Sequence, residues 1–564
     1  MRRAASNKSF RGLAVAGTHV VLLGWDLADV GLKHGLLGFA IKRDDTTEGE
    51  TYWLRGTKTF PNTQPPLAPG GDASSHDQPY QSFQWADYSA KPKHHYVYTI
   101  IAMQGAPGAM RDGPSLVLDV TTEAEWSDDP DNRHSVFFNR AAIASQEYAR
   151  RFQNKAPDDV GPPAYEWLSR GLAEAIVRFI GQAKGPGFEL RVAIYEFQLP
   201  LILDALRAAA RRGVDVKVVF DAIENATQTP IEANEEAIAA AKLGPFCTGV
   251  THGKIMHNKF IVLVKADKAV AVLTGSTNFT ESAVYGQLNC AHVVANPAIA
   301  QTYLDYWNEI SGDPEVAELR GFTGTETPNP PNPPPSGVTA VFSPRSGLSL
   351  LNEYGVLAGA ATKALFMTFA FGVDDVFLSS YLKADGVLRF ALLDKEASGR
   401  GAVKGRQNVA KMRNIPNTVL AVGQNMPLNE FDRWLKEKAG LPESKFVKWV
   451  HTKFMLVDPL SNDPLVISGS ANFSKASTES NHENMILVRG DTRVADIYLG
   501  EFMRQFSSYA FRDAAAAAAK GDQKTASKWR PQDLSPNDSW VAAYFKHGSS
   551  RALRRIYFSG SGGK

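Results

Sequence analysis

The sequence predicts an α/β protein in which two α/β/α half-domains pack with pseudo-two-fold symmetry, preceded by a β-sandwich. Three observations predict this class. A short polar pattern occurs twice with the same internal spacing, and each copy follows apolar runs that alternate with helical patterns. The first 120 residues instead show strand-like alternation. At 564 residues the chain is too long for one ordinary domain, and about three domains are expected.

Residues 1–120 are predicted to form the β-sandwich. Alternating apolar and polar residues occur at Thr18 to Trp25, Gly38 to Lys42 and Tyr96 to Ile101. The segment Lys91 to Tyr98 (KPKHHYVY) resembles the strand-entry corner of fibronectin type III-like sandwiches. Residues 121–164 are polar and partly helical, and we interpret them as a connector.

Two half-domains are predicted, at residues 165–322 and 338–510. In each, two apolar strands flank a helical pattern, and two more strands carry the polar motif. In the first half the segments are Leu190 to Phe197, Leu201 to Arg212, Val214 to Phe220, Lys259 to Val264 and Ala269 to Leu273. In the second half they are Ala364 to Phe371, Val376 to Lys383, Val387 to Leu393, Lys453 to Val457 and Pro464 to Ile467. Continuous apolar runs separated by helical patterns indicate parallel strands buried on both faces.

The remaining segments are a linker and a tail. Residues 323–337 include the proline-rich run TETPNPPNPPPSG, which predicts an extended, semi-rigid linker between the halves. Residues 511–564 form the C-terminal tail, whose alanine run, Ala514 to Ala519, is predicted to be helical.

The repeated pattern places histidine, lysine, serine and asparagine at equal offsets. The first copy consists of His257, Lys259, Gly275, Ser276 and Asn278, and the second of His451, Lys453, Gly469, Ser470 and Asn472. The serine follows the histidine by 19 positions and the asparagine by 21 in both copies. Because side chains alternate along a strand, His-x-Lys puts both side chains on one face. We expect each glycine to let the backbone approach a ligand.

These residue types suit cleavage of a phosphate ester if the two copies face each other. The lysines would neutralise the non-bridging oxygens, and the asparagines would donate hydrogen bonds that strengthen in the transition state. A histidine titrates near neutral pH, so one can attack while the other protonates the leaving oxygen. The two cysteines of the chain do not make a metal site, and neither half-site offers metal-ligand spacing.

Together the two copies resemble the phospholipase D superfamily, whose motif is H-x-K-x4-D followed by G-S-x-N. The second copy matches in full, including Asp458, and continues into Asn481-His482-Glu483-Asn484, which is similar to the N-x-E-N of several branches. The first copy has Val264 where the motif has Asp, so the half-sites are predicted to be inequivalent. The resemblance covers roughly residues 165 to 510.

What the resemblance implies is covalent catalysis through a phosphohistidine, with no metal and no other cofactor. By analogy His257 is the nucleophile, and His451 is the general acid and then the base. Lys259, Lys453, Asn278 and Asn472 complete the catalytic set, and Ser276, Ser470, Asp458 and Glu483 support it. Two of these roles have simpler alternatives. Glu483 would orient a histidine or only cap a loop, and Asp458, which precedes Pro459, would support the site or form a turn.

A basic segment follows the last strand before the second motif. It carries Arg400, Lys404, Arg406, Lys411 and Arg413, with nearby glycines. It is either a solvated mobile loop or a loop over the site that contacts phosphates of a polymer or membrane surface. The chain as a whole has 61 basic and 59 acidic residues, so its net charge of +2 neither demands nor excludes nucleic acid.

Three functions fit the sequence. The first is a phospholipase D-type hydrolase that cleaves a phospholipid head-group ester, with peripheral membrane contact. The second is a metal-independent endonuclease with the same site, and the third is a non-catalytic phosphate-binding protein. We expect a monomer. Two cysteines, no apolar run of about 18 residues and no clear signal core predict a cytoplasmic location, with export as an effector left open.

Overall fold

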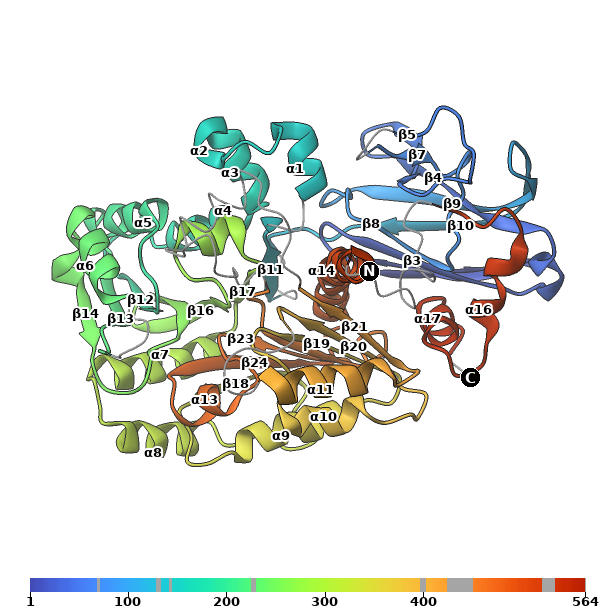
Figure 1. Ribbon diagram of the computed structural model, residues 1–564. Coiled ribbons are helices and arrows are strands. Elements are labelled where there is room, and N and C mark those ends of the chain that lie inside the picture. The colour runs from blue at the N-terminus through green and yellow to red at the C-terminus, as the bar shows by residue number, and fades with distance from the viewer. Residues whose placement is uncertain are drawn as a thin grey trace.

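The computed structural model comprises a β-sandwich and two α/β halves (Figure 1). It describes residues 1–67, 71–127, 133–141, 145–224, 230–395, 402–423, 450–519 and 533–562. In Figure 1 the sandwich lies on the right, the first half on the left and the second half below the centre. No helix within the described ranges is long and apolar enough to cross a membrane.

The N-terminal domain is a sandwich of two four-stranded antiparallel sheets, which confirms the predicted β-sandwich. One sheet has the order β1 (Arg2–Ser6), β2 (Phe10–Ala16), β3 (Val21–Leu27) and β8 (Gln84–Asp87), and the other β10 (Ala109–Thr121), β9 (His95–Ala106), β4 (Leu36–Asp45) and β5 (Glu50–Trp53). Strands β6 (Arg55–Gly56) and β7 (Ala73–Ser74) pair separately. Trp25, Phe39, Tyr96 and Tyr98 fill the core because alternate residues of each strand point inward.

The first half is built on a seven-stranded mixed sheet. Its order is β11 (His134–Phe138), β17 (Cys290–Val294), β16 (Lys268–Gly275), β15 (Lys259–Lys265), β12 (Phe188–Ile194), β13 (Asp215–Asp221) and β14 (Cys247–Val250). Strands β12 and β13 are parallel, as the apolar runs predicted. Strand β14, which the sequence did not predict, is parallel to β13, and the remaining pairings are antiparallel. The edge strand β11 comes from the expected connector, where its five residues give little periodicity.

The second half repeats this topology. Its sheet has the order β18 (Gly337–Ser343), β24 (Glu483–Arg489), β23 (Leu465–Gly469), β22 (Phe454–Val457), β19 (Ala364–Phe369), β20 (Leu388–Leu393) and β21 (Thr418–Val422). Again the strands after each helical crossover are parallel, and the motif strands are antiparallel. The equal order of both sheets confirms the predicted pair of half-domains.

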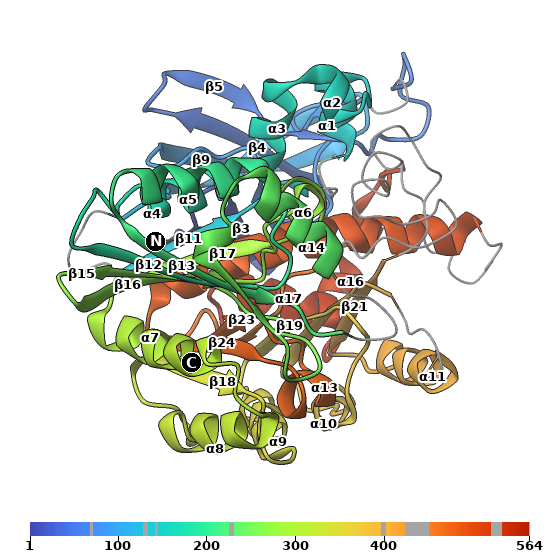
Figure 2. The ribbon, with the colours of Figure 1, turned by 90° about the vertical axis from the view of Figure 1, so that its left-hand side faces the viewer.

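Helices cover the faces of both sheets, with α4 and α5 above the first sheet and α7 below it (Figure 2). The helices of the first half are α1 (Ser145–Phe152), α2 (Pro157–Val160), α3 (Pro162–Ser169), α4 (Leu172–Ile180), α5 (Pro200–Arg211), α6 (Ile231–Ala240), α7 (Pro297–Ser311) and α8 (Val316–Glu326). Those of the second half are α9 (Ser349–Gly359), α10 (Asp375–Tyr381), α11 (Ala402–Arg413), α13 (Lys475–Glu479) and α14 (Thr492–Ala519). Between α8 and β18 the proline-rich segment has neither helix nor strand.

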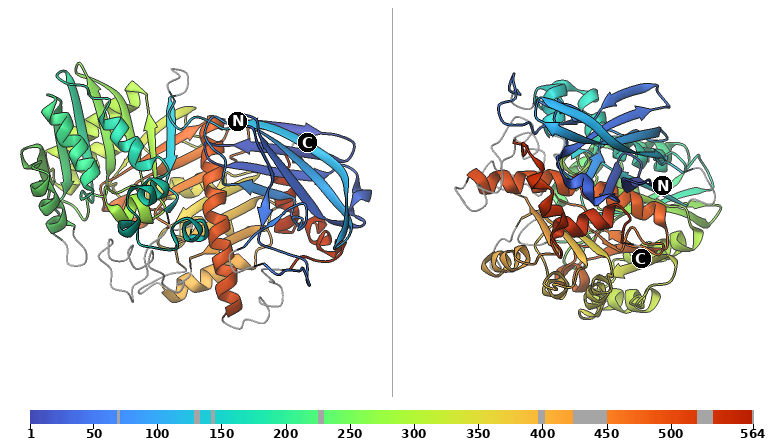
Figure 3. Two further views of the ribbon diagram at one scale, coloured as in Figure 1. Left: turned by 90° about the horizontal axis from the view of Figure 1, so that it is seen from above. Right: turned by 90° about the vertical axis from the view of Figure 1, so that its right-hand side faces the viewer.

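The long helix α14 joins the three parts. It packs on strands β20 to β23 of the second sheet and on β2 and β8 of the sandwich (Figure 3). Its Glu501 accepts from Arg170 at 2.6 Å and from Arg504 at 2.7 Å, and all three side chains are buried. Buried arginines need such a partner because desolvation of a charge is costly.

The C-terminal tail completes the sandwich core. Helices α16 (Ala542–Phe545) and α17 (Ser550–Phe558) follow the turn that contains Trp540. The Trp540 ring meets Phe83 and Phe39 at centroid distances of 5.6 and 6.2 Å, and its Nε1 donates to Leu36 O at 3.0 Å. The tail is therefore part of the N-terminal domain in space.

We predict that Trp540→Ala destabilises the sandwich by roughly 2–3 kcal/mol, since a large, partly buried aromatic leaves a cavity and an unpaired carbonyl. Thermal unfolding measures this, with Val117→Ala on the exposed side of β10 as control. Equal melting temperatures for both variants would mean that the tail does not support the core.

Candidate active site

The two motifs meet where the halves face each other. His257 lies directly before β15 and His451 shortly before β22, and their ring centroids are 6.4 Å apart with an interplanar angle of 76°. Backbone bridges between Met256 and His482, and between Leu288 and Val450, join the halves beside the rings. A phosphate-sized group between the rings would be in reach of both.

Each histidine is held through Nδ1 by a residue of the other half. His257 Nδ1 lies 2.9 Å from Glu483 Oε2, and His451 Nδ1 lies 2.8 Å from Asn289 Oδ1. The motif serines fix these partners: Ser470 Oγ donates to Glu483 Oε2 at 2.7 Å and Ser276 Oγ to Asn289 Oδ1 at 2.8 Å. Nδ1 is thereby the ring nitrogen that Glu483 and Asn289 orient in the two rings.

Asn289 is a site residue that the sequence reasoning missed. It follows Ser276 by 13 positions, and Glu483 follows Ser470 by the same 13, so the repeat contained the signal. Glu483 itself orients a histidine in the structure and does not merely cap a loop. The two half-sites differ here in charge, because one histidine has a carboxylate partner and the other an amide.

Both motif lysines are buried beside the histidines. Lys259 Nζ donates to His257 O at 2.7 Å, and Lys453 Nζ donates to His451 O at 2.5 Å. Burial lowers the pKa of Lys259 to about 8, against the opposing effect of Glu483, Glu196 and Asp221. An ammonium has three donors, so Lys259 can hold this carbonyl and a phosphate oxygen together.

A carboxylate of the first half holds the motif residue Asn278. Asn278 Nδ2 donates to Glu196 Oε2, and the Oδ1 atoms of Asn278 and Asn472 are buried without a hydrogen-bond partner among the described residues. An amide oxygen only accepts, so these two atoms suit a hydrogen-bond donor and not a phosphate oxygen.

Gly275 and Gly469 bring the backbone close to a neighbouring strand. A Cβ at Gly275 would lie 2.3 Å from Cys290 O, and one at Gly469 would lie 2.2 Å from Asn484 O. Ser276 N and Ser470 N donate to these same carbonyls at 3.1 and 2.9 Å. A close approach is therefore present between strands, and it requires glycine at both positions.

Asp458 lies at the far end of β22 from His451. Its carboxylate accepts from the backbone N–H groups of Thr362, Lys363 and Ala364 at 2.7–2.8 Å. It therefore fixes the start of β19 and supports the site only through the strand.

Two buried aspartates that the motif does not include position the histidine segments. Asp221 Oδ1 accepts from Met256 N at 2.6 Å, and Asp394 Oδ1 accepts from Val450 N at 2.9 Å. Each holds the residue directly before a motif histidine. Burial raises the pKa of Asp221 to about 7 and that of Glu483 to about 7.

Buried polar contacts lock the two halves around this centre. Asn484 Nδ2 donates to Asn258 Oδ1 at 2.9 Å, and Tyr303 OH donates to Asn484 Oδ1 at 3.1 Å. On the other side, Tyr498 OH lies 3.1 Å from His292 Nδ1. His292 thus contributes to packing between the two halves.

The basic segment is a helix. Arg400 lies outside the described residues, but Lys404, Arg406, Lys411 and Arg413 belong to α11. Lys404 pairs with Asp375 at 2.6 Å and Arg413 with Asp513 at 2.7 Å. The expected loop was wrong for residues 402–413, because good helix formers outweigh the single Gly405. Two of its cations already have acidic partners, which weakens the case for phosphate binding there.

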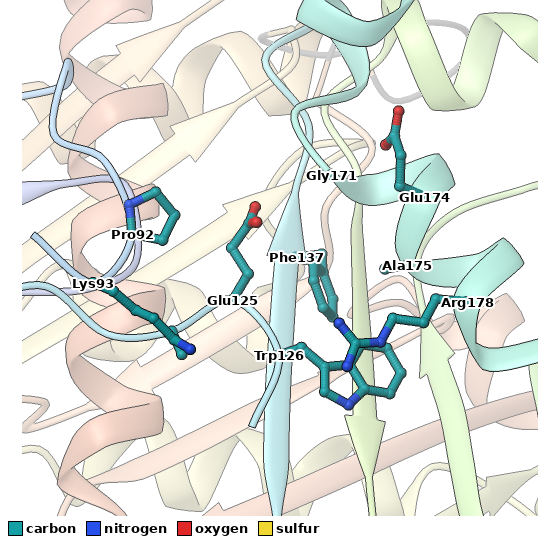
Figure 4. A pocket seen from close by; sticks show the side chains of 10 residues that line it. Pro92, Lys93, Glu125, Trp126, Phe137, Gly171, Glu174, Ala175 and Arg178 are labelled. Atoms are coloured by element: carbon teal, nitrogen blue, oxygen red, sulfur yellow. The ribbon is translucent and has the colours of Figure 1, made fainter. Parts of the chain in front are cut away.

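A separate cavity of about 290 Å³ lies between the sandwich and the first half (Figure 4). Pro92 and Lys93 face Glu125, Trp126 and Arg178 across it, and the Arg178 guanidinium lies 4.4 Å from the Trp126 ring centre. The motif residues are not in its lining.

Metal-ligating side chains gather in the sandwich. Across the described ranges, the one group of three whose ligand atoms could converge on an ion is Asp45, Glu48 and His94. Lys91 Nζ also pairs with Glu48, so a cation already occupies part of this cluster.

Sequence comparison connects this geometry to a known family. The family model described as "Cardiolipin synthase, PLD-like domain" matches residues 176–311 and 415–506, which contain the first and second motif respectively. The phospholipase D superfamily resemblance is thereby confirmed, and the chain belongs to this superfamily through these two segments. Its members transfer or hydrolyse phosphodiesters. No curated protein matches the sequence significantly.

Solved structures that are similar to parts of this chain include a kinase, a synthase and a phospholipase D family member. Polyphosphate kinase from Porphyromonas gingivalis is 15% identical, with 56% of this chain and 43% of that chain aligned and a TM-score of 0.37. Phosphatidylserine synthase from Haemophilus influenzae is 14% identical to this chain. The alignment covers 60% of this chain and 85% of the synthase, with a TM-score of 0.42. The phospholipase D family member Nuc from Salmonella typhimurium is 31% identical to this chain. The alignment covers 25% of this chain and 87% of Nuc, with a TM-score of 0.20.

We predict that Gly469→Ala destabilises the protein by about 2 kcal/mol or more, because its Cβ would collide with a backbone carbonyl that cannot yield easily. Chemical unfolding measures the effect. Gly321→Ala in helix α8, where a Cβ meets nothing within 4 Å, is the control and should be neutral or stabilising. Equal stabilities would contradict the close approach.

Proposed function

We propose that this protein is a phospholipase D-type phosphodiesterase that cleaves or transfers the head group of a phospholipid through a covalent phosphohistidine. The observation that carries the proposal is the meeting of His257 and His451 from two halves, at a centroid distance of 6.4 Å. Lys259 and Lys453 supply positive charge beside both rings, as an anionic diester requires.

The asymmetric partners support His257 as the nucleophile. Glu483 Oε2 accepts from Ser470 and Oε1 accepts from Asn481, so the hydrogen bonds suit an ionised carboxylate that accepts from His257 Nδ1–H. A phosphorus bonded to Nε2 leaves the ring positively charged, and an adjacent carboxylate stabilises that charge. Asn289 is neutral and offers His451 no such compensation.

His451 suits the general acid. Asn289 Nδ2 donates to Ala283 O at 2.9 Å, which turns its Oδ1 toward His451 Nδ1. In the first step Nε2 of His257 attacks phosphorus, the bond to the leaving oxygen breaks, and His451 Nε2–H protonates that oxygen. In the second step His451 takes a proton from water or an alcohol, whose oxygen displaces Nε2 of His257.

Nucleic acid is the competing substrate. The Asn481-x-Glu483-Asn484 run favours it, because bacterial endonuclease branches of the superfamily have a similar run. The partnered cations of α11 favour the lipid, because a polyanion needs free cations along its path. A parallel assay on phosphatidylcholine, cardiolipin, single-stranded DNA and RNA decides between them. Salt-sensitive cleavage of DNA or RNA without head-group release from any lipid would reverse the choice, and lack of turnover on every diester would favour a binding protein.

Activity should persist in excess EDTA, because the lysines occupy the role that a cation would play. The measurement is head-group release with and without chelator, with a divalent ion added back. Turnover that is lost on chelation and restored by the ion would overturn the metal-free scheme.

The histidine roles predict different pre-steady-state behaviour for His257→Ala and His451→Ala. Each should lose at least about 10³-fold of lipid turnover, because the two rings act as one unit. With bis(p-nitrophenyl) phosphate, whose leaving group departs unprotonated, His451→Ala should still release a burst of nitrophenol and retain phosphate on the protein. A burst from His257→Ala instead would reverse the assignment, and half-maximal activity in either variant would indicate independent sites.

The pH profile should be bell-shaped, with limbs near pH 7 and pH 8. Below about pH 7, the pKa of Glu483, this carboxylate gains a proton and no longer compensates the charged His257 ring. Above about pH 8, the pKa of Lys259, the lysine loses its charge. Lys259→Arg should move the alkaline limb upward, because a guanidinium stays protonated. Glu483→Gln should remove the acid limb and lower kcat. An unchanged profile in both variants would show that other groups titrate.

A further inference from the structure

The two half-sites present different side chains at equivalent positions after strands β12 and β19. Strand β12 pairs with β13 so that Ile194 lies opposite Phe220, and β19 pairs with β20 so that Phe369 lies opposite Leu393. The next residues, Asp221 and Asp394, make the same bond to the residue before each histidine. Ile194 and Phe369 are therefore equivalent in the two halves.

The two halves have the same number of residues between these strand ends and the next helix. Helix α5 begins at Pro200 and α10 at Asp375, six positions after Ile194 and Phe369 respectively. With no insertion between strand and helix, Glu196 in the first half corresponds to Phe371 in the second. An acidic residue and an aromatic residue thus occupy the same place.

Glu196 is tied to the first half-site. It accepts a hydrogen bond from Asn278 Nδ2, and its side chain is partly exposed. Its negative charge raises the pKa of Lys259 and so opposes the lowering of that pKa by burial. With Glu483 it makes the His257 side rich in carboxylates. Phe371 is 50% exposed, and the residue before it is Ala370, where the first half has Tyr195. The second half-site thus has a half-exposed aromatic ring where the first has a carboxylate.

We propose that these residues orient the substrate: Glu196 receives the phosphodiester substituent that carries hydroxyl or ammonium donors, and Phe371 contacts the apolar substituent. The inference rests on the proposed function and names the substrate class of that site. A carboxylate accepts hydrogen bonds from charged or hydroxylic donors, and an exposed aromatic ring gains by covering apolar surface. A phospholipid has one substituent of each kind.

A nucleic acid fits this pair less well. Both substituents of its phosphates are polar sugars, and a neighbouring phosphate beside Glu196 would be repelled by the carboxylate. An exposed phenylalanine can stack on a base, so the choice depends on the charge at Glu196 and is open to test.

The test compares kcat/KM of the full chain for monomeric dihexanoyl phosphatidylethanolamine and dihexanoyl phosphatidylmethanol. Glu196→Gln keeps an acceptor for Asn278 but removes the charge. We expect it to lower the ethanolamine-to-methanol ratio about tenfold, because a hydrogen bond to a charged acceptor is lost. Dihexanoyl phosphatidylglycerol separates hydroxyl from ammonium recognition. Glu232→Gln, exposed on α6, is the control and should leave the ratio unchanged.

Phe371→Ala and Phe371→Glu test the other side. Both should raise KM for the dihexanoyl lipids at least fivefold, with Phe371→Glu the more severe, and both changes fall on a half-exposed side chain. Leu201→Ala, an exposed apolar residue on α5, is the matched control.

The outcomes separate this inference from the proposed function. Wild-type turnover of lipids with an unchanged ratio in Glu196→Gln, or an unchanged KM in the Phe371 variants, overturns the inference alone. An equal loss of kcat/KM on all lipids in Glu196→Gln would show that Glu196 only positions the site, and this result also overturns the inference. A wild-type protein that turns over no phosphodiester overturns both proposals.

Discussion

The crossed hydrogen bonds between the halves are the constraint on which the rest of the site depends. Glu483 of the second half holds His257, and Asn289 of the first half holds His451. Each of these hydrogen bonds to a histidine therefore crosses from one half to the other. The equal topology of the two sheets, the backbone bridges beside the rings and the polar contacts of Asn484 all serve to keep this crossed arrangement in register.

Burial strengthens the electrostatic interactions of these residues, and it also imposes a desolvation cost on their charges. Lys259 and Glu483 are almost fully buried, so their pKa values move toward each other and their charges interact in a medium of low polarity. Such groups are costly to the fold unless they are paired, and the site pairs each of them. Perturbed, paired ionisable groups at a domain interface are typical of catalytic centres.

The duplicated scaffold carries an unequal site. Glycine, serine, lysine, histidine and asparagine occur at the same motif positions in both halves, and the glycines allow the close approach of neighbouring strands. The residues around them differ between the halves: Glu483 corresponds to Asn289, and Glu196 corresponds to Phe371. Symmetric machinery with asymmetric neighbours suits a diester, because one phosphate has two different substituents and only one of them leaves.

The sequence by itself determined the repeat, the parallel strand pairs, the β-sandwich and the motif residues, because these depend on local periodicity and on offsets along the chain. It did not reveal β11, the packing of the tail on the sandwich or the helix at residues 402–413, since a five-residue strand and a weakly periodic basic segment carry little local signal. Only the tertiary structure decided which side chains of one half meet those of the other. The equal offset of 13 positions marks Asn289 as the counterpart of Glu483, but only the fold shows that each contacts the histidine of the other half. Asp221 and Asp394 act through backbone contacts, and Gly275 and Gly469 face a neighbouring strand, that only the folded sheets identify.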